Sequence, residues 1–186
     1  MVSYEERVSI FKDELELILD LNIREFTKLC LSESPDYIFT DCPSSSSGKY
    51  HPISELGADG NILHTKKVVT VAYILCRGLD CEEYRNEILS ACIIHDLVKQ
   101  GKKKSGHTLK NHPSLAADLV EQVQKDTQML GDDSYNIIRN GVGYHYGPWS
   151  TGVWKKDITK YTQTELCVYL SDYFASKREF HVDHRR

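Results

Sequence analysis

The stretch at residues 92–100, CIIHDLVKQ, decides the fold. Apolar residues recur at steps of three and four over residues 88–93, so we predict a buried helix that leads to His95 and Asp96. Side chains at the end of such a helix can point into a cleft between packed neighbours. Lys99 follows one helical turn after Asp96, and we expect it to face the same cleft.

Helical patterns extend from this stretch in both directions. Residues 4–31 and 61–78 carry apolar side chains at helical spacing, and the second helix is expected to end at Gly78. Downstream, Pro113 suits the first turn of a further helix. No segment shows the two-residue alternation of a strand, and no internal repeat is visible. The chain is therefore predicted to be all-α.

Three helix starts are predicted from capping residues. Asp80 with Glu83 forms an acidic version of the capping box. Asp133 can cap the helix that follows it. Thr162 with Glu165 forms a capping box for the last helix.

The chain is expected to divide near residue 60. Residues 1–60 are predicted to be N-terminal helices and a Ser/Gly-rich loop packed on a core domain of residues 61–180, with a charged tail at 181–186. The polar, turn-rich part of the first segment, residues 32–60, is long and lacks periodicity. It is either a functional loop or a flexible linker.

The composition of the 186-residue chain is that of a globular protein with one core domain, because 40% of the residues are hydrophobic and 27% are charged. The net charge of -4 argues against binding nucleic acid over the whole surface. No apolar run approaches the roughly 20 residues of a membrane helix, and the acidic start does not resemble a signal peptide. The six cysteines are scattered without a CxxC pair, and most of them are interpreted as small buried residues, so we expect a cytoplasmic protein, of a cell or of an infected host.

Histidines and aspartates form the most informative pattern. The candidate metal ligands are, in order, His64, His95, Asp96, His112, His145 and Asp172. Imidazole and carboxylate together suit Mn, Fe, Co, Ni or Zn. Four histidines and two aspartates are enough for two divalent transition-metal ions with one bridging carboxylate, a site that can activate water. His107 competes with His112, which we favour because it begins a helix.

This order resembles the HD-domain superfamily of metal-dependent phosphohydrolases. CIIHDLVK surrounds the doublet, and LSDYFASKR surrounds the last aspartate. The resemblance covers about residues 60–178 and implies an all-α HD-domain helical bundle, here with an N-terminal helical extension. By position, it implies these metal ligands: His64, His95, Asp96 and Asp172.

Two further histidines resemble those of the binuclear branch of this family, which includes dinucleoside-polyphosphate hydrolases and cyclic-dinucleotide phosphodiesterases. They lie in KNHPSLAADLV and GVGYHYGPW. On that match His112 and His145 complete a second metal site. His51, His181 and His184 match no ligand position.

The segment 43–52, PSSSSGKYHP, is a candidate for substrate binding. It is not a P-loop, because Pro43 replaces the first glycine of that motif and Tyr50 follows the lysine. A Ser/Gly loop with Lys49 can nevertheless donate to phosphate. Phage and bacterial HD hydrolases carry a similar loop, which adds Tyr50 and His51 as candidates.

Other substrate candidates lie beyond the doublet. Lysines 102–104 and 110 form a basic loop; such a run is usually solvated, but its place beside the ligands keeps Lys103 as a candidate. Trp149 either stacks on a base or closes the core. Arg178 is explained by the dipole at the end of the last helix.

The resemblance thus implies a metal-dependent phosphohydrolase or phosphodiesterase that acts on a nucleotide or small nucleotide derivative through a metal-activated water. Asp96 and Lys99 are the expected catalytic residues. The alternatives are a 3′-5′ exonuclease on single-stranded nucleic acid and a non-catalytic nucleotide-binding protein. We expect a small nucleotide as partner, no membrane, and no preference for nucleic acid; the sequence is compatible with a homo-oligomer.

Overall fold

The computed structural model describes residues 2–180, and over that range it consists of helices and turns with no strand. This confirms the all-α prediction. The predicted charged tail, with His181 and His184, lies outside the described residues. Among the described helices, none is both long enough and apolar enough to cross a bilayer.

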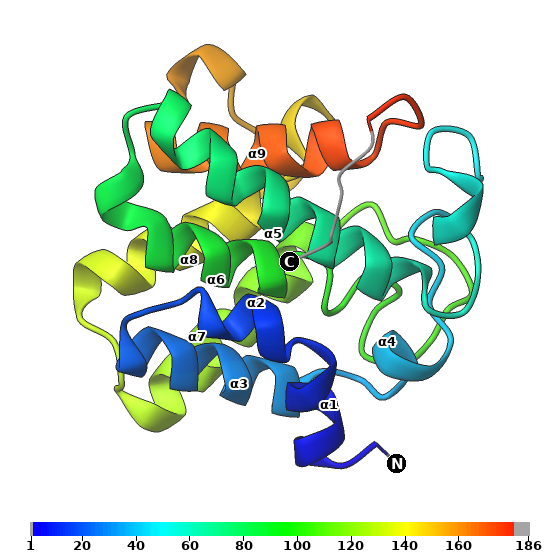
Figure 1. Ribbon diagram of the computed structural model, residues 1–186, viewed down its shortest axis with the longest axis horizontal. Coiled ribbons are helices and arrows are strands. Elements are labelled where there is room, and N and C mark those ends of the chain that lie inside the picture. Colours follow the sequence, from blue (N-terminus) through cyan, green and yellow to red (C-terminus); the bar gives the residue numbers. More distant parts are fainter. Residues whose placement is uncertain (1, 181–186) are drawn as a thin grey trace.

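The N-terminal helices lie together on one side of the molecule (Figure 1). Asp20 caps the longest of them by accepting a hydrogen bond from the Ile23 amide, and this helix packs against the core helices α6 and α7. Phe26 and Cys30 are buried in that contact layer. The N-terminal elements are α1 (Tyr4–Ile10), α2 (Lys12–Glu16) and α3 (Leu21–Glu33).

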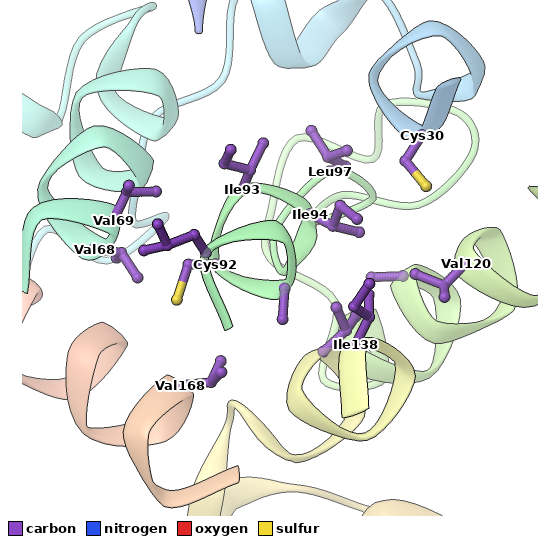
Figure 2. Packing of buried hydrophobic residues seen from close by; sticks show 14 of the residues in the cluster. Cys30, Val68, Val69, Cys92, Ile93, Ile94, Leu97, Val120, Ile138 and Val168 are labelled. Atoms are coloured by element: carbon purple, nitrogen blue, oxygen red, sulfur yellow. The ribbon is translucent and has the colours of Figure 1, made fainter. Parts of the chain in front are cut away.

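Helix α6 lies at the centre of the core. It contacts α3, α5, α8 and α9, and the side chains of Ile93 and Ile94 are surrounded by those of neighbouring helices (Figure 2). A helix enclosed in this way must be apolar on all sides. All six cysteines are buried and free, as expected. The core helices are α5 (Gly60–Gly78), α6 (Arg85–Ile94), α7 (His112–Thr127), α8 (Asp132–Tyr144) and α9 (Gln163–Ala175).

Short helical turns connect the longer elements. After α6 the chain continues as a series of turns over residues 95–104. The short elements are α4 (Tyr37–Thr40), η1 (Ile53–Glu55), η2 (Glu82–Tyr84), η3 (Gly147–Trp149), η4 (Gly152–Trp154) and η5 (Ile158–Lys160).

One of the three predicted helix caps is confirmed, and two are wrong. Thr162 and Glu165 form the expected capping box of α9. Asp80 instead has a left-handed backbone with φ of 53°, because the chain reverses there, and α6 begins without a side-chain cap. Gly131 occupies the cap position of α8, and Asp133 lies inside the first turn of that helix. A carboxylate at this position interacts favourably with the helix dipole.

The turn-rich segment 32–60 packs against the start of α5. The Cys42 amide donates to the Ala58 carbonyl at 2.7 Å, and the Ser44 amide donates to the Glu55 carbonyl at 2.9 Å. Gly60 makes this approach possible, because a Cβ atom there would lie 1.8 Å from the Glu55 carbonyl oxygen. The loop is thereby held beside the helix that carries His64.

Candidate metal centre

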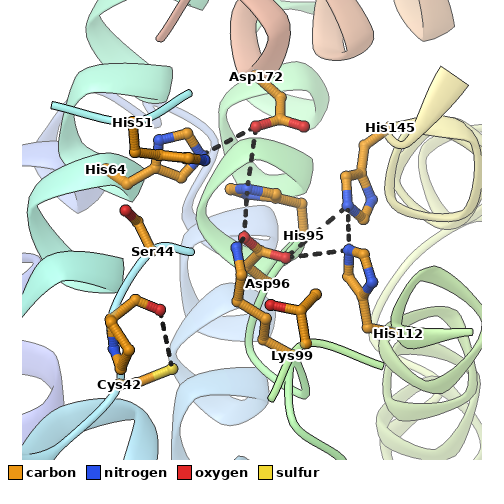
Figure 3. A network of polar contacts seen from close by, with 12 residues as sticks. Cys42, Ser44, His51, His64, His95, Asp96, Lys99, His112, His145 and Asp172 are labelled. Carbon is orange, nitrogen blue, oxygen red and sulfur yellow. Dashed lines mark hydrogen bonds and ion pairs between the residues drawn. The ribbon is translucent and has the colours of Figure 1, made fainter. Parts of the chain in front are cut away.

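The predicted ligands converge from helices that are distant in sequence. Asp96, just beyond α6, lies between the others in Figure 3. Helix ends supply most of the set, because a residue at a helix end can project into the space between neighbouring helices. The other members are His64 on α5, His95 at the end of α6, His112 at the start of α7, His145 at the end of α8 and Asp172 on α9.

The carboxylate of Asp96 joins two groups of ligand atoms. Its Oδ1 lies 3.3 Å from His112 Nε2 and 3.8 Å from His145 Nε2. Its Oδ2 lies 3.4 Å from His95 Nε2. Ligand atoms of the group Asp96, His112 and His145 lie within 4.8 Å of one another, and a second group is formed by His64, His95 and Asp96. Asp96 is the residue that the two groups share.

Asp172 completes the second group. Its Oδ1 lies 2.9 Å from His64 Nε2 and 3.9 Å from His95 Nε2. Burial of this carboxyl would raise its pKa, but the hydrogen bond and charge of His64 outweigh burial and hold the pKa below its usual range. The side chain is therefore an anion, the form in which a carboxylate binds a metal.

Backbone carbonyls orient three of the histidines. Each ring donates its Nδ1 proton to the carbonyl three residues earlier, which leaves a lone pair on Nε2. The distances are 2.7 Å from His95 to Cys92, 2.7 Å from His112 to Leu109 and 2.6 Å from His145 to Val142. His112 Nε2 and His145 Nε2 then face each other at 2.9 Å. Two lone pairs repel at that distance unless a proton or a metal ion lies between them.

Several buried polar atoms of the site lack a hydrogen-bond partner. They include His95 Nε2 and Asp96 Oδ1. Because buried polar atoms are nearly always paired, unpaired acceptors that point to a common centre indicate a place for a cation. Nitrogen and carboxylate donors fit a transition metal such as Mn, Fe, Co, Ni or Zn.

The charge of Asp96 is balanced by Lys99. Burial would raise the pKa of Asp96, but Lys99 first and then His95 hold it well below the usual range. The Lys99 ammonium forms a buried ion pair with Asp96 Oδ2. Lys99 lines the cavity together with Asp96, as expected. The two residues lie in the turns that follow α6, however, and not in a continuation of the helix on which the prediction relied.

His145 is held in the neutral form. Burial lowers its pKa to about 3, and the neighbouring His112 and His95 act in the same direction. A neutral imidazole has the free lone pair that metal binding requires.

Glu55 is part of the site, although the sequence analysis did not identify it. Its Oε2 accepts from His51 Nδ1 at 2.9 Å and lies 3.5 Å from His64 Nδ1, and its Oε1 lies 3.4 Å from Lys67 Nζ. Burial would raise the pKa of this carboxyl, but hydrogen bonds from the two histidines lower it to about 2. Glu55 lies in a segment without periodicity. The one usable signal was Lys67, a lysine on the buried face of α5 that needs a counter-charge.

A cavity of about 640 Å³ lies above these ligands. Its floor includes Asp96, His112, His145 and Asp172. Hydroxyl groups and aromatic rings make up most of its walls. The other lining residues are Ser44, Ser45, Ser46, Ser47, Tyr50, His51, Lys99, His107, Thr108, Tyr146, Trp149, Tyr169, Tyr173, Ser176 and Lys177.

Three of the predicted substrate residues line this cavity, and two do not. Tyr50, His51 and Trp149 belong to the lining, and Trp149 is 56% exposed, so it does not close the core. Lys49 and Lys103 are exposed and lie outside the lining. The Lys49 ammonium lies 5.3 Å from the ring centroid of Tyr50, at the edge of the lining. The role of both lysines in binding stays a prediction.

Two further expectations concern His107 and Arg178. His107 is exposed at the cavity wall, whereas His112 is buried beside Asp96, in agreement with the preference for His112. Arg178 lies beyond the end of α9 at Ala175, so the explanation by the helix dipole was wrong. Its guanidinium donates to the His51 carbonyl at 3.1 Å and to the Gly48 carbonyl at 2.5 Å.

Comparison with protein-family models matches residues 61–177 to the HD domain. Neither the curated proteins nor the solved structures compared with the chain give a match. The matched segment covers more than half of the 186 residues and includes all six predicted ligands. The chain therefore belongs to the HD-domain superfamily of metal-dependent phosphohydrolases.

Proposed function

We propose that the protein hydrolyses a phosphate ester or anhydride in a nucleotide or small nucleotide derivative. One observation carries the proposal: Asp96 joins two groups of ligand atoms on the floor of a cavity with aromatic and hydroxyl walls. The cavity volume of about 640 Å³ is typical of small-molecule sites. A small substrate is therefore favoured over a nucleic acid strand.

The ligand set suits two divalent transition-metal ions that share Asp96. When bound, such ions polarise a phosphoryl oxygen and lower the pKa of water. The chain's own contribution is to hold Asp96 as an anion and to fix its position through Lys99. One ion would be held by His64, His95, Asp96 and Asp172, and the other by Asp96, His112 and His145.

The walls support a substrate that carries a base. The ring centroids of Tyr146 and Trp149 lie 6.1 Å apart on one wall, and aromatic rings favour stacking with bases. The hydroxyl group of Ser45 belongs to the same lining, where it can donate to a phosphate oxygen. Ser46 joins the Ser/Gly loop to the basic loop, since its Oγ accepts from the Thr108 amide at 2.6 Å.

The test is a metal-dependent hydrolysis assay on a substrate panel. Protein loaded with each candidate metal is given nucleotides, p-nitrophenyl phosphate and single-stranded RNA, and phosphate or nucleotide release is measured. We expect release from nucleotides. Asp96→Asn should abolish it, because the substitution removes the charge that joins the ligand groups while keeping the shape of the side chain.

Asp118→Asn is the matched control, because Asp118 is exposed on α7 and lies outside the cavity. Its activity should equal that of the wild type. Trimming of RNA without nucleotide hydrolysis would instead indicate an exonuclease. Binding of nucleotides without turnover, with every metal, would indicate a non-catalytic binding protein.

A further inference from the structure

Lys177 is positioned at the cavity by aromatic rings. It follows α9 and is half-buried. Its Nζ lies 3.9 Å from the ring centroid of Tyr173 and 5.3 Å from that of Tyr50, and all three residues line the cavity. Cation–π contacts hold an ammonium group in place without cancelling its charge.

Two other cations near Lys177 already have partners. Lys99, the other lysine of the lining, forms a buried ion pair with Asp96. The Arg178 guanidinium donates to backbone carbonyls of the Ser/Gly loop. Among the described residues, no ion pair includes Lys177. It is therefore the lining lysine whose charge is available to a ligand.

Lys177 follows the candidate ligand Asp172 by five residues, three of them on α9 and two beyond its end at Ala175. The Lys177 amide donates to the Phe174 carbonyl at 3.0 Å, so the chain continues as a turn past the helix end. If one phosphate of a ligand binds at the floor of the cavity, Lys177 can bind a different group of the same ligand.

We propose that Lys177, held by Tyr50 and Tyr173, forms a second anion subsite that binds a phosphate group next to the one that is hydrolysed. The assignment of that ligand as substrate rests on the proposed function. The preferred substrate then carries at least two phosphate groups, as a nucleoside diphosphate or triphosphate or a dinucleoside polyphosphate does. A nucleoside monophosphate would leave the subsite unused.

Binding of inorganic anions tests the subsite without relying on turnover. Calorimetry on the metal-loaded protein would measure the affinities of phosphate, pyrophosphate and tripolyphosphate. We expect Lys177→Gln to weaken pyrophosphate and tripolyphosphate by about 10–100-fold, the typical range for loss of a charged contact. Phosphate affinity should change by less than about twofold, because a single phosphate at the floor does not reach Lys177.

Two variants serve as controls. Lys177→Arg keeps the charge and should retain the preference for the longer anions. Lys155→Gln removes one positive charge from an exposed position outside the lining and should bind all three anions as the wild type does. Circular dichroism confirms that each variant is folded.

The subsite is refuted if Lys177→Gln weakens all three anions equally or leaves all three unchanged. It is also refuted if Lys177→Arg behaves like Lys177→Gln, because charge would then not be what binds. Failure of the proposed function looks different: the anion preference and its loss in Lys177→Gln would be observed, but no nucleotide would be hydrolysed.

Discussion

Each ligand histidine is oriented by the partner of its second ring nitrogen. His95, His112 and His145 use a backbone carbonyl three residues earlier. His64 differs, because its Nδ1 faces the buried carboxylate of Glu55. A carboxylate behind a metal-binding imidazole raises its basicity and fixes its direction. We therefore expect Glu55 to position His64 for metal binding.

Replacing Glu55 with Gln should lower metal affinity by about 10–100-fold, as loss of such partners typically does. The amide keeps the size of the side chain but lacks the negative charge. Competition with a fluorescent chelator measures the affinity directly. Glu83→Gln, at an exposed position, is the control. Equal affinities for the two variants would show that Glu55 does not position the ligand.

Trp149 offers the clearest test of base recognition. The ring is 56% exposed and lines the cavity, whereas Trp154 is buried. Stacking contributes roughly 1–3 kcal/mol per base, so Trp149→Ala should raise KM for nucleotides by about 5–150-fold. The kinetics of p-nitrophenyl phosphate should stay nearly unchanged. A uniform loss on every substrate would assign Trp149 to packing instead.

At the scale of elements, the ends of helices build the site. Helices α6 and α8 end at His95 and His145, and α7 begins at His112. The start of α5 receives the loop that carries Glu55, and Gly60 leaves space for it. The spacing between helix ends therefore controls the distances between ligands.

The two glycines at the ends of α5, Gly60 and Gly78, test whether close packing of the loop at the start of this helix depends on a missing side chain. In Gly60→Ala the new Cβ would meet the Glu55 carbonyl, so the loop must move, and we expect a loss of about 1–3 kcal/mol in the free energy of unfolding. In Gly78→Ala the new Cβ would have no atom within 4 Å, so the free energy of unfolding should change by less than about 1 kcal/mol. Urea unfolding measures both. Similar values for the two would show that the loop adapts without cost.

For the whole molecule, metal binding and folding should be coupled. Asp96 and four histidines are buried among the core helices, and the facing nitrogens of His112 and His145 repel unless a proton or a metal ion lies between them. An ion that binds only the folded state stabilises it by mass action. The apo protein should therefore be measurably less stable than the loaded one.

Loading with metal at 100 times its dissociation constant should add about 2.7 kcal/mol per site. At about 2–4 °C per kcal/mol, Tm rises by roughly 5–11 °C for one site and by about twice that for two. Calorimetry with and without a chelator measures the shift, and elemental analysis should give about two ions per chain. A single ion per chain would refute the two-metal prediction and leave the family assignment intact.

Sequence alone was enough to predict the helical class, and the candidate ligands that it indicated lie together in the structure. Helical periodicity, the Pro113 start and the Thr162 cap depend on neighbours a few residues away, so these signals are local. The ligand order in the chain is a family pattern that can be read without coordinates. The helix start at Asp80 was wrong because the backbone at a chain reversal depends on the helices that it joins. The start at Asp133 was misplaced by two residues, since Gly131 is the cap of α8.

Only the tertiary structure identified Glu55 and Lys177, and only it left Lys49 and Lys103 outside the cavity. Glu55 reaches His64 across a loop without periodicity. The charge of Lys177 matters because Lys99, the other lysine of the lining, is already paired with Asp96. Which side chain is buried, and which charge is neutralised, depends on contacts between segments far apart in the chain, and local sequence patterns do not record such contacts.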